Sequence, residues 1–248
     1  MTHASPMERH HARSTFAFVM IAFILLGGVA ADSPSGRFEQ NMMVRLHMHD
    51  DHDALQRIQG WLVHGKLDAA RELADALARA PDEPGMSAFT IQTTRVRASA
   101  AALAQATSID EALREEPRLA AACGACHVAA GVQLELRSPA IPPDRPTIEA
   151  RMARHVWATD RLWESLLADT IDPWRAGLDL LAAPSLPASE LGDDRLVLAK
   201  QFQHLALDTR ALLGPLDLTV RAAAFGELLV ACAGCHALRP SDQASRLP

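Results

Sequence analysis

The sequence contains no tyrosine, only four cysteines and few runs of β-branched residues. Alanine and leucine dominate instead. Because they favour helices, whereas β-branched and aromatic residues favour strands, we predict an all-α fold. Apart from the cysteine motifs described below, the sequence contains no acid–base pair and no nucleophile arrangement, so we do not expect an enzyme that turns over a substrate.

The first 31 residues differ in composition from the rest of the chain. Arg9 and Arg13 precede an unbroken apolar run at 16–31, which ends in small residues, as in a secretory signal peptide. This run has 16 residues, fewer than the ~20 that span a bilayer, and no cysteine follows it to carry a lipid. We therefore expect a periplasmic protein, which would be membrane-anchored only if this segment stays uncleaved.

Without residues 1–31, the chain has 22 basic and 29 acidic residues and a net charge of −7. This acidic balance argues against nucleic acid and anionic lipid as partners. A partner with a basic docking patch is the expected match. The sequence leaves the oligomeric state open.

The chain contains an internal repeat. Residues 48–78 align with residues 152–182 at a constant offset of 104, with nine identical positions. A C-x-x-C-H motif also occurs twice, at 123–127 and at 232–236, with an offset of 109. The five additional residues of the second copy fit into the Pro- and Ser-containing stretch 184–194, where a surface loop would tolerate them.

Between the two copies, residues 138–147 carry four prolines in ten positions, so this stretch cannot be helical throughout. We interpret it as a linker between a first domain, 32–137, and a second domain, 148–240, with a flexible tail at 241–248. Each domain divides into four helical segments, which we predict at 38–64, 67–80, 87–106 and 109–129 in the first and at 148–169, 173–183, 194–213 and 216–238 in the second.

Two of these predicted helices carry recognisable start signals. Ser108 and Glu111 form a capping-box pattern, and Asp172 stands before Pro173 as an N-cap residue would. Four helices with short connections and one apolar stripe each favour an up-and-down bundle. The expected architecture is therefore two tandem four-helix bundles.

All four cysteines belong to the two C-x-x-C-H motifs, and three conventional uses of cysteine compete for them. A structural zinc ion would need ligands from both copies at once and would leave the histidines unexplained. A redox dithiol belongs at a helix N-terminus after a strand, whereas these motifs lie near the ends of predicted helices. A disulfide within a helix is poorly placed, although an exported chain permits disulfides.

Covalent haem accounts for every residue of the motif. On a helix, residues three and four apart share a face, so Cys126 and His127 both lie beside Cys123. The two thiols can add to the vinyl groups of haem, and the following imidazole then binds the iron as its proximal ligand. The second copy offers the same set, namely Cys232, Cys235 and His236. We predict two covalently attached haem c groups per chain, one in each bundle.

With this motif ending the fourth helix of an Ala- and Leu-rich unit, each half resembles a class II c-type cytochrome, the cytochrome c′ bundle family. The stretch IEARMARH at 148–155 is similar to the opening of that family's first helix. The resemblance implies a bundle that holds haem between its first and last helices and either transfers electrons or binds small gases.

The resemblance also implies that the sixth position of each iron is either open or filled from the first helix of its bundle. Helical periodicity places His155 on the apolar stripe in the second half, with Met152 at its edge, and places His52 and Met48 on the stripe of the first half. We favour His155 and His52 as distal ligands and keep the two methionines as alternatives. Two other histidines show no such geometry, namely His64 and His204.

We therefore expect a one-electron carrier between redox proteins, in which the haem undergoes the redox change and the protein sets its potential. A gas-binding or sensing haem protein with at least one five-coordinate iron is the alternative. A dihaem redox enzyme is the least favoured interpretation, because the sequence contains no separate catalytic motif.

Overall fold

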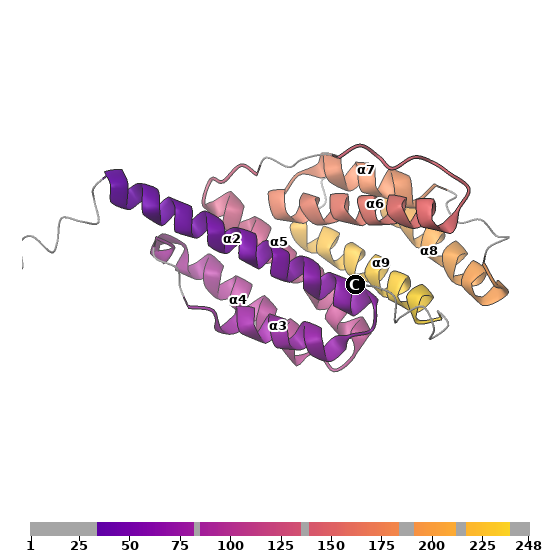
Figure 1. The fold of residues 1–248 in the computed structure, drawn as a ribbon, viewed down its shortest axis with the longest axis horizontal. Helices are drawn as coiled ribbons and strands as arrows, with labels where there is room; N and C mark the ends of the chain where they lie inside the picture. Colours follow the sequence, from indigo (N-terminus) through magenta and orange to yellow (C-terminus); the bar gives the residue numbers. More distant parts are fainter. Residues whose placement is uncertain (1–33, 82–84, 135–138, 184–190, 212–216, 239–248) are drawn as a thin grey trace, which may run out of the picture. The chain divides into compact units, whose positions relative to one another are not determined.

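The computed structural model describes residues 34–81, 85–134, 139–183, 191–211 and 217–238. Within these ranges every regular element is a helix and no strand occurs (Figure 1). This confirms the all-α prediction for the described part of the chain. The predicted signal peptide, the predicted tail and residues 184–190 lie outside the described residues.

The chain divides into two compact units. One comprises Met1–His49 together with Glu83–Gly85, and the other comprises Asp50–Asp82 together with Met86–Pro248. Helix α2 (Pro34–Val63) contributes residues to both units. Both C-x-x-C-H motifs belong to the second unit.

The second unit contains the rest of the described helices. In chain order they are α3 (Leu67–Arg79), the short 3-10 helix η3 (Ser87–Phe89), α4 (Thr90–Gln105), α5 (Ile109–Ala129), α6 (Ile148–Ala168), α7 (Ile171–Leu181), α8 (Asp193–Ala211) and α9 (Leu218–Ala237). The predicted ends of α3 to α9 differ from the observed ends by three residues or fewer. Residues 139–147, within the predicted linker, contain no helix.

The helices of the second unit pack in sequence order within each half and also across the halves. Helix α4 packs between α3 and α5, while α6, α7, α8 and α9 form a closed series of contacts. Helix α5 additionally packs along both α6 and α9. One hydrophobic cluster therefore contains buried side chains from both halves, among them Ile58, Leu62, Leu113, Leu166, Trp174 and Phe225.

A close backbone approach marks the contact between α5 and α9. A Cβ atom on Gly226 would lie 3.0 Å from the Cα atom of Arg114 and 3.3 Å from the carbonyl oxygen of Leu113. Within α5, the carbonyl of Leu113 lacks its usual helical hydrogen bond, because Pro117, four residues later, has no N–H. Beside this contact, the guanidinium of Arg114 pairs with Glu227 of α9 at 2.7 Å. The absence of a side chain at position 226 thus lets the two helices approach closely.

The predicted start of α7 is wrong by two residues. Helix α7 begins at Ile171 after an N-cap at Thr170, so Asp172 lies in the first turn rather than at the cap. The reason is the tight connection from α6, which ends with Asp169 in the left-handed conformation at φ 49°. The N–H of Thr170 then bonds back to the carbonyl of Ser165 at 3.2 Å. In the first turn, Asp172 still faces the positive end of the helix dipole.

Helix α9 is long and apolar enough to cross a membrane by length and composition, and among the described helices it alone meets that criterion. It also has extensive contacts within the second unit, on α5 and α8 and more sparsely on α6. Its inner face buries Phe225, Leu228 and Leu229. Apolar composition is equally expected of a helix that packs on several neighbours.

We predict that Gly177→Ala destabilises the protein, because the new Cβ atom would lie 2.6 Å from the Ala158 carbonyl oxygen and 2.9 Å from the Leu162 side chain. Forcing α7 away from α6 should cost about 1–3 kcal/mol. Gly60→Ala in α2 is the matched control, because a Cβ atom there meets nothing within 4 Å. It should stabilise the protein by up to about 1 kcal/mol through helix propensity. Urea unfolding measures both, and equal effects would contradict the packing of α7 on α6.

Candidate functional site

Both C-x-x-C-H motifs lie in the last turns of helices whose first turns are capped by side chains. In α5, the hydroxyl of Ser108 accepts a hydrogen bond from the Glu111 N–H at 3.1 Å. In α9, the carboxylate of Asp217 accepts one from the Val220 N–H at 2.9 Å. Each cap satisfies an N–H group of the first turn and so stabilises the start of the helix that carries the motif.

The Glu111 side chain departs in one detail from a standard capping box. Its carboxylate accepts bonds from the N–H and the hydroxyl of Thr107, at 2.6 and 2.7 Å, rather than from the N–H of the N-cap residue. These two bonds lower the pKa of Glu111. The start of α5 is nevertheless the predicted one.

The first cysteine of each motif is held in its protonated form. Burial, with smaller contributions from the neighbouring Asp51 and Cys126, raises the pKa of Cys123 to about 12. Burial, with a smaller contribution from Cys235, likewise raises the pKa of Cys232 to about 12. A redox dithiol needs the opposite shift, because the thiolate is its reactive form.

The geometry also disfavours the other conventional uses of these cysteines. All four are free in the structure, and among the described residues no group of three His, Cys, Asp or Glu side chains is arranged to hold a metal ion. The first motif contacts α6 at Leu166 and Leu167, whereas the second lies near His155 of the same helix. Twelve helical residues span about 18 Å, so the two motifs cannot share one zinc ion.

The first motif docks against the C-terminal end of α6. The Nδ1 atom of His127 lies 3.1 Å from the carbonyl oxygen of Leu167. A carbonyl oxygen can only accept, so Nδ1 carries a proton, and in the neutral imidazole Nε2 then has the free lone pair. Nε2 is therefore the nitrogen available to a metal. A Cβ atom on Gly124 would lie 1.9 Å from the Leu166 carbonyl oxygen, so this close docking requires glycine at that position.

The second motif gathers imidazoles from three helical segments. The ring of His236 meets the ring of His64, just beyond the end of α2, edge to face with centroids 5.3 Å apart. His155 of α6 is close enough to His236 for the charge of one imidazole to act on the other. The ring of Phe202 from α8 lies 5.4 Å from the ring of His155.

The environment of His155 favours the neutral imidazole. Burial, with smaller contributions from the charges of His236, Arg151 and Arg154, lowers the pKa of His155 to about 4. The neutral ring is the form that binds a metal. The structure therefore brings the favoured distal candidate of the second half within electrostatic range of that half's C-x-x-C-H histidine, in a protonation state suited to ligation.

Sequence reasoning missed the position of His64. This residue follows the last residue of α2, and the repeat alignment pairs it with Ala168, so neither helical periodicity nor the repeat could indicate a role for it. Its contact with His236 depends on how α2 packs across the two halves. His204, on α8, is exposed.

The other candidate distal ligands have different surroundings. His52 is half-buried on α2, and its charge acts on Asp160 of α6. Met48 is half-buried and belongs to the N-terminal unit. Met152 is half-buried on α6, three residues before His155. Of the four candidates, the structure associates His155 with a C-x-x-C-H histidine.

The residues of both motifs fit covalent haem by their chemistry. Each motif presents two thiols and an imidazole within one helical turn, and Cys123 and Cys232 both pack against the hydrophobic cluster. Protonated thiols can add to vinyl groups, and the tautomer of His127 leaves Nε2 for an iron atom. These residues would hold a haem at each motif.

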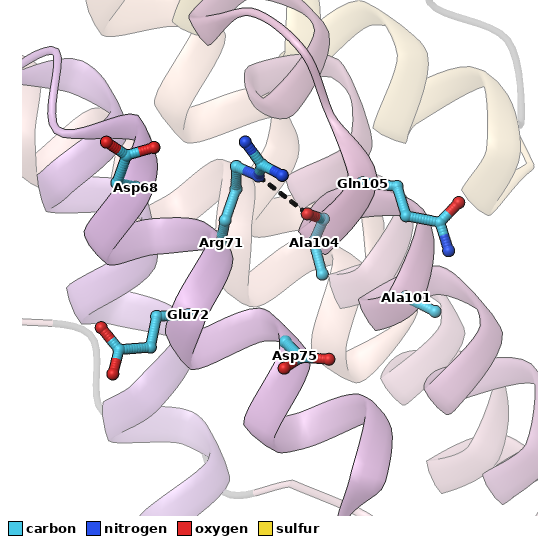
Figure 2. Close-up of a pocket in the computed structure, with 7 residues that line it drawn as sticks. All are labelled: Asp68, Arg71, Glu72, Asp75, Ala101, Ala104 and Gln105. Carbon is cyan, nitrogen blue, oxygen red and sulfur yellow. Dashed lines mark hydrogen bonds between the residues drawn. The ribbon is translucent and has the colours of Figure 1, made fainter.

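A polar hollow of about 420 Å³ lies elsewhere, between α3 and α4. In Figure 2 the side chain of Arg71 turns toward the Ala104 carbonyl oxygen, 2.9 Å from Nε. The hollow is lined by Asp68, Arg71, Glu72, Asp75, Ala101, Ala104 and Gln105. Its charged lining and its lack of cysteine and histidine make it unsuitable for haem.

No protein-family model, no curated protein and no solved structure matches this chain. The case for any function therefore depends on the motifs and their geometry.

A buried carboxyl group lies on the helix face that carries the first motif. Glu116 precedes Cys123 by seven residues, two turns of α5, and so shares its face. It is fully buried, and neither carboxyl oxygen has a hydrogen-bond partner. Burial alone raises the pKa of Glu116 well above 4.5, so the folded protein holds this carboxyl neutral to a higher pH than the unfolded chain does.

We predict that Glu116→Gln stabilises the protein increasingly as pH rises above about 4.5, the value at which the unfolded chain loses this proton. Above that pH, unfolding of the unmodified chain releases the proton, so rising pH favours unfolding until the folded pKa is passed. The amide has no proton to release. Urea unfolding at pH 4.5 and pH 8 measures the difference.

Glu227→Gln serves as the control for that experiment. The pKa of Glu227 is lowered by its hydrogen bond to Arg114, so this carboxylate stabilises the fold above its unfolded pKa and its replacement should cost a little stability at pH 8. An E116Q variant that lost stability with rising pH, as the unmodified chain does, would contradict the burial of a neutral carboxyl.

Proposed function

We propose that this chain is a dihaem c-type cytochrome that carries single electrons between redox proteins. The observation that carries this proposal is the doubled C-x-x-C-H motif, with each copy in the last turns of a capped helix and each first cysteine half-buried against the hydrophobic cluster and protonated. A redox dithiol, a shared zinc ion and a disulfide each fail on at least one part of this arrangement.

The proposed architecture is two tandem four-helix bundles that resemble class II c-type cytochromes. The spacing of the helices supports it. Helices α3 and α7 begin at Leu67 and Ile171, which keeps the repeat offset of 104, and helices α5 and α9 begin at Ile109 and Leu218, which keeps the motif offset of 109. The packing of α5 on α6 and α9 makes the two proposed bundles close neighbours.

Each haem would be attached by addition of two thiols. In each addition the sulfur bonds to one vinyl carbon and the hydrogen goes to the other, so no oxidant is needed. Bound haem supplies the one-electron couple. His127 and His236 would each hold an iron, and the buried surroundings together with any second ligand would set its potential.

The surroundings of the two motifs bear on the sixth position of each iron. In the second half, the charges of His155 and His236 act on one another, which supports His155 as the sixth ligand and hence electron transfer. In the first half, the charge of Asp51, the neighbour of His52 on α2, acts on Cys123, so His52 remains the favoured sixth ligand there. The alternative function, binding or sensing of a small gas, would require an open position on at least one iron.

Export and partners follow from the same proposal. Thioether attachment takes place outside the cytoplasm, which agrees with an export signal at 1–31 and a periplasmic location. The net charge of −7 beyond that segment suits redox partners with basic docking patches.

We predict two covalent haems per chain when the protein is exported from a host with a cytochrome c maturation system. The pyridine haemochrome spectrum and the intact mass measure this number. The double variant C123A/C126A should carry one haem, as should C232A/C235A, and the quadruple variant should carry none. Absence of covalent haem from the unmodified protein would overturn the proposed function.

We predict that His155→Ala converts one of the two haems from low spin to high spin and lets that haem bind carbon monoxide when reduced. Absorption spectra of the oxidised, reduced and carbon monoxide-treated protein test this. His204→Ala is the control and should leave the spectra unchanged, because His204 is exposed on α8. If His64→Ala produced the change instead, the distal ligand would be His64.

A further inference from the structure

The C-terminal end of α6 presents backbone carbonyl groups to the first motif. The last four carbonyls of a helix have no N–H of that helix to accept from. At the end of α6, the N–H groups of Asp169 and Thr170 both donate hydrogen bonds to the carbonyl oxygen of Ser165. The carbonyl of Leu167 is thereby left as an acceptor for the Nδ1–H of His127, at 3.1 Å.

Glycine at one motif position permits this contact. A Cβ atom on Gly124 would lie 1.9 Å from the Leu166 carbonyl oxygen and 3.3 Å from that of Leu167. The repeat places Ala233 at the corresponding position of the second motif, and the glycine there is Gly234, around which a Cβ atom meets nothing within 4 Å. The two motifs thus differ at position 124, where the backbone of the first lies against the Leu166 carbonyl oxygen.

A buried arginine fixes the end of α6 in place. Arg221 of α9 donates to the carbonyl and the hydroxyl of Ser165, at 2.9 and 2.7 Å, and to the carbonyl of Thr170 at 3.0 Å. Its other terminal nitrogen pairs with the carboxylate of Asp169. One side chain therefore holds the turn that presents the Leu167 carbonyl.

We propose that the C-terminal end of α6 belongs to the first haem's ligand environment, where the Leu167 carbonyl orients His127 and lowers the reduction potential of that haem. This inference rests on the proposed function. An imidazole whose Nδ1–H donates to a carbonyl is a more basic ligand through Nε2, and a more basic ligand stabilises the ferric state. Gly124 and Arg221 act as positioning residues, through the contact that they permit and hold.

The consequence is that the second half of the chain tunes the haem of the first half. Helix α6 contacts His127 at one end, through Leu167, and approaches His236 near the other, through His155. A single helix about 18 Å long between these residues thus serves both sites.

The test compares one-haem chains, so that each potential belongs to a known haem. Gly124→Ala is placed in the C232A/C235A chain, which carries only the first haem. Gly234→Ala, the same chemical change in open space, is placed in the C123A/C126A chain. Spectroelectrochemical titration should give a positive shift for Gly124→Ala and no shift for Gly234→Ala. Equal shifts, or no shift for Gly124→Ala, would overturn the inference.

Arg221→Lys gives a second variant if Gly124→Ala fails to fold. Lysine keeps the charge but cannot reach all four acceptors with its single ammonium group, so a positive shift would arise from movement of α6 and not from a changed charge. An unchanged potential in a folded Arg221→Lys chain would overturn the inference.

The unmodified protein offers an independent measurement. Proton NMR should show slow solvent exchange of the Nδ1–H of His127, and rapid exchange would overturn the inference. Covalent haem with unmoved potentials would leave the proposed function standing and remove only this inference, whereas absence of haem would remove both.

Discussion

The close approach of α5 to the end of α6 is the contact on which the rest of this arrangement depends. Helices whose facing positions carry side chains lie 8–10 Å apart, and glycine at position 124 removes the atom that would meet the Leu166 carbonyl. The same approach brings His127 to the Leu167 carbonyl, buries the first motif and joins the two halves of the hydrophobic cluster. The absence of a side chain at Gly124 therefore permits the contact between α5 and the end of α6, about 40 residues apart in the sequence.

The interior around this contact includes two ionisable side chains, and the loss of water around them is compensated in different ways. Arg221 is buried, and its bonds to Ser165, Asp169 and Thr170 compensate for the loss of water. Glu116 is buried without a hydrogen-bond partner and is accommodated by keeping its proton. The bonds of Arg221 hold the end of α6 in place. Glu116, by contrast, is a titratable group on the same face of α5 as the first motif, two turns before it.

The repeat preserves the helices while the sites diverge. The starts of α3 and α7 keep the offset of 104 and those of α5 and α9 keep the offset of 109. Nevertheless, the first motif meets backbone carbonyls of α6 and the second meets the imidazole of His64 and lies near that of His155. Two copies with equal cysteine spacing thus acquire different surroundings, because the second copy supplies α6 to both sites. Different surroundings for the two proposed haems would give them different potentials, which an electron carrier with two centres can use.

Local interactions explain what the sequence by itself determined. Helical periodicity, the cap at Ser108 and the placement of both motifs near helix ends depend on residues a few positions apart, and these features can be read from the chain. The start of α7 at Ile171 depended on how α6 ends, and so lay beyond that reasoning. The approach of His64 to His236 and of His127 to Leu167 joins residues 172 and 40 positions apart. Only tertiary packing decided them, because no periodicity within one helix specifies which face of another helix it will meet.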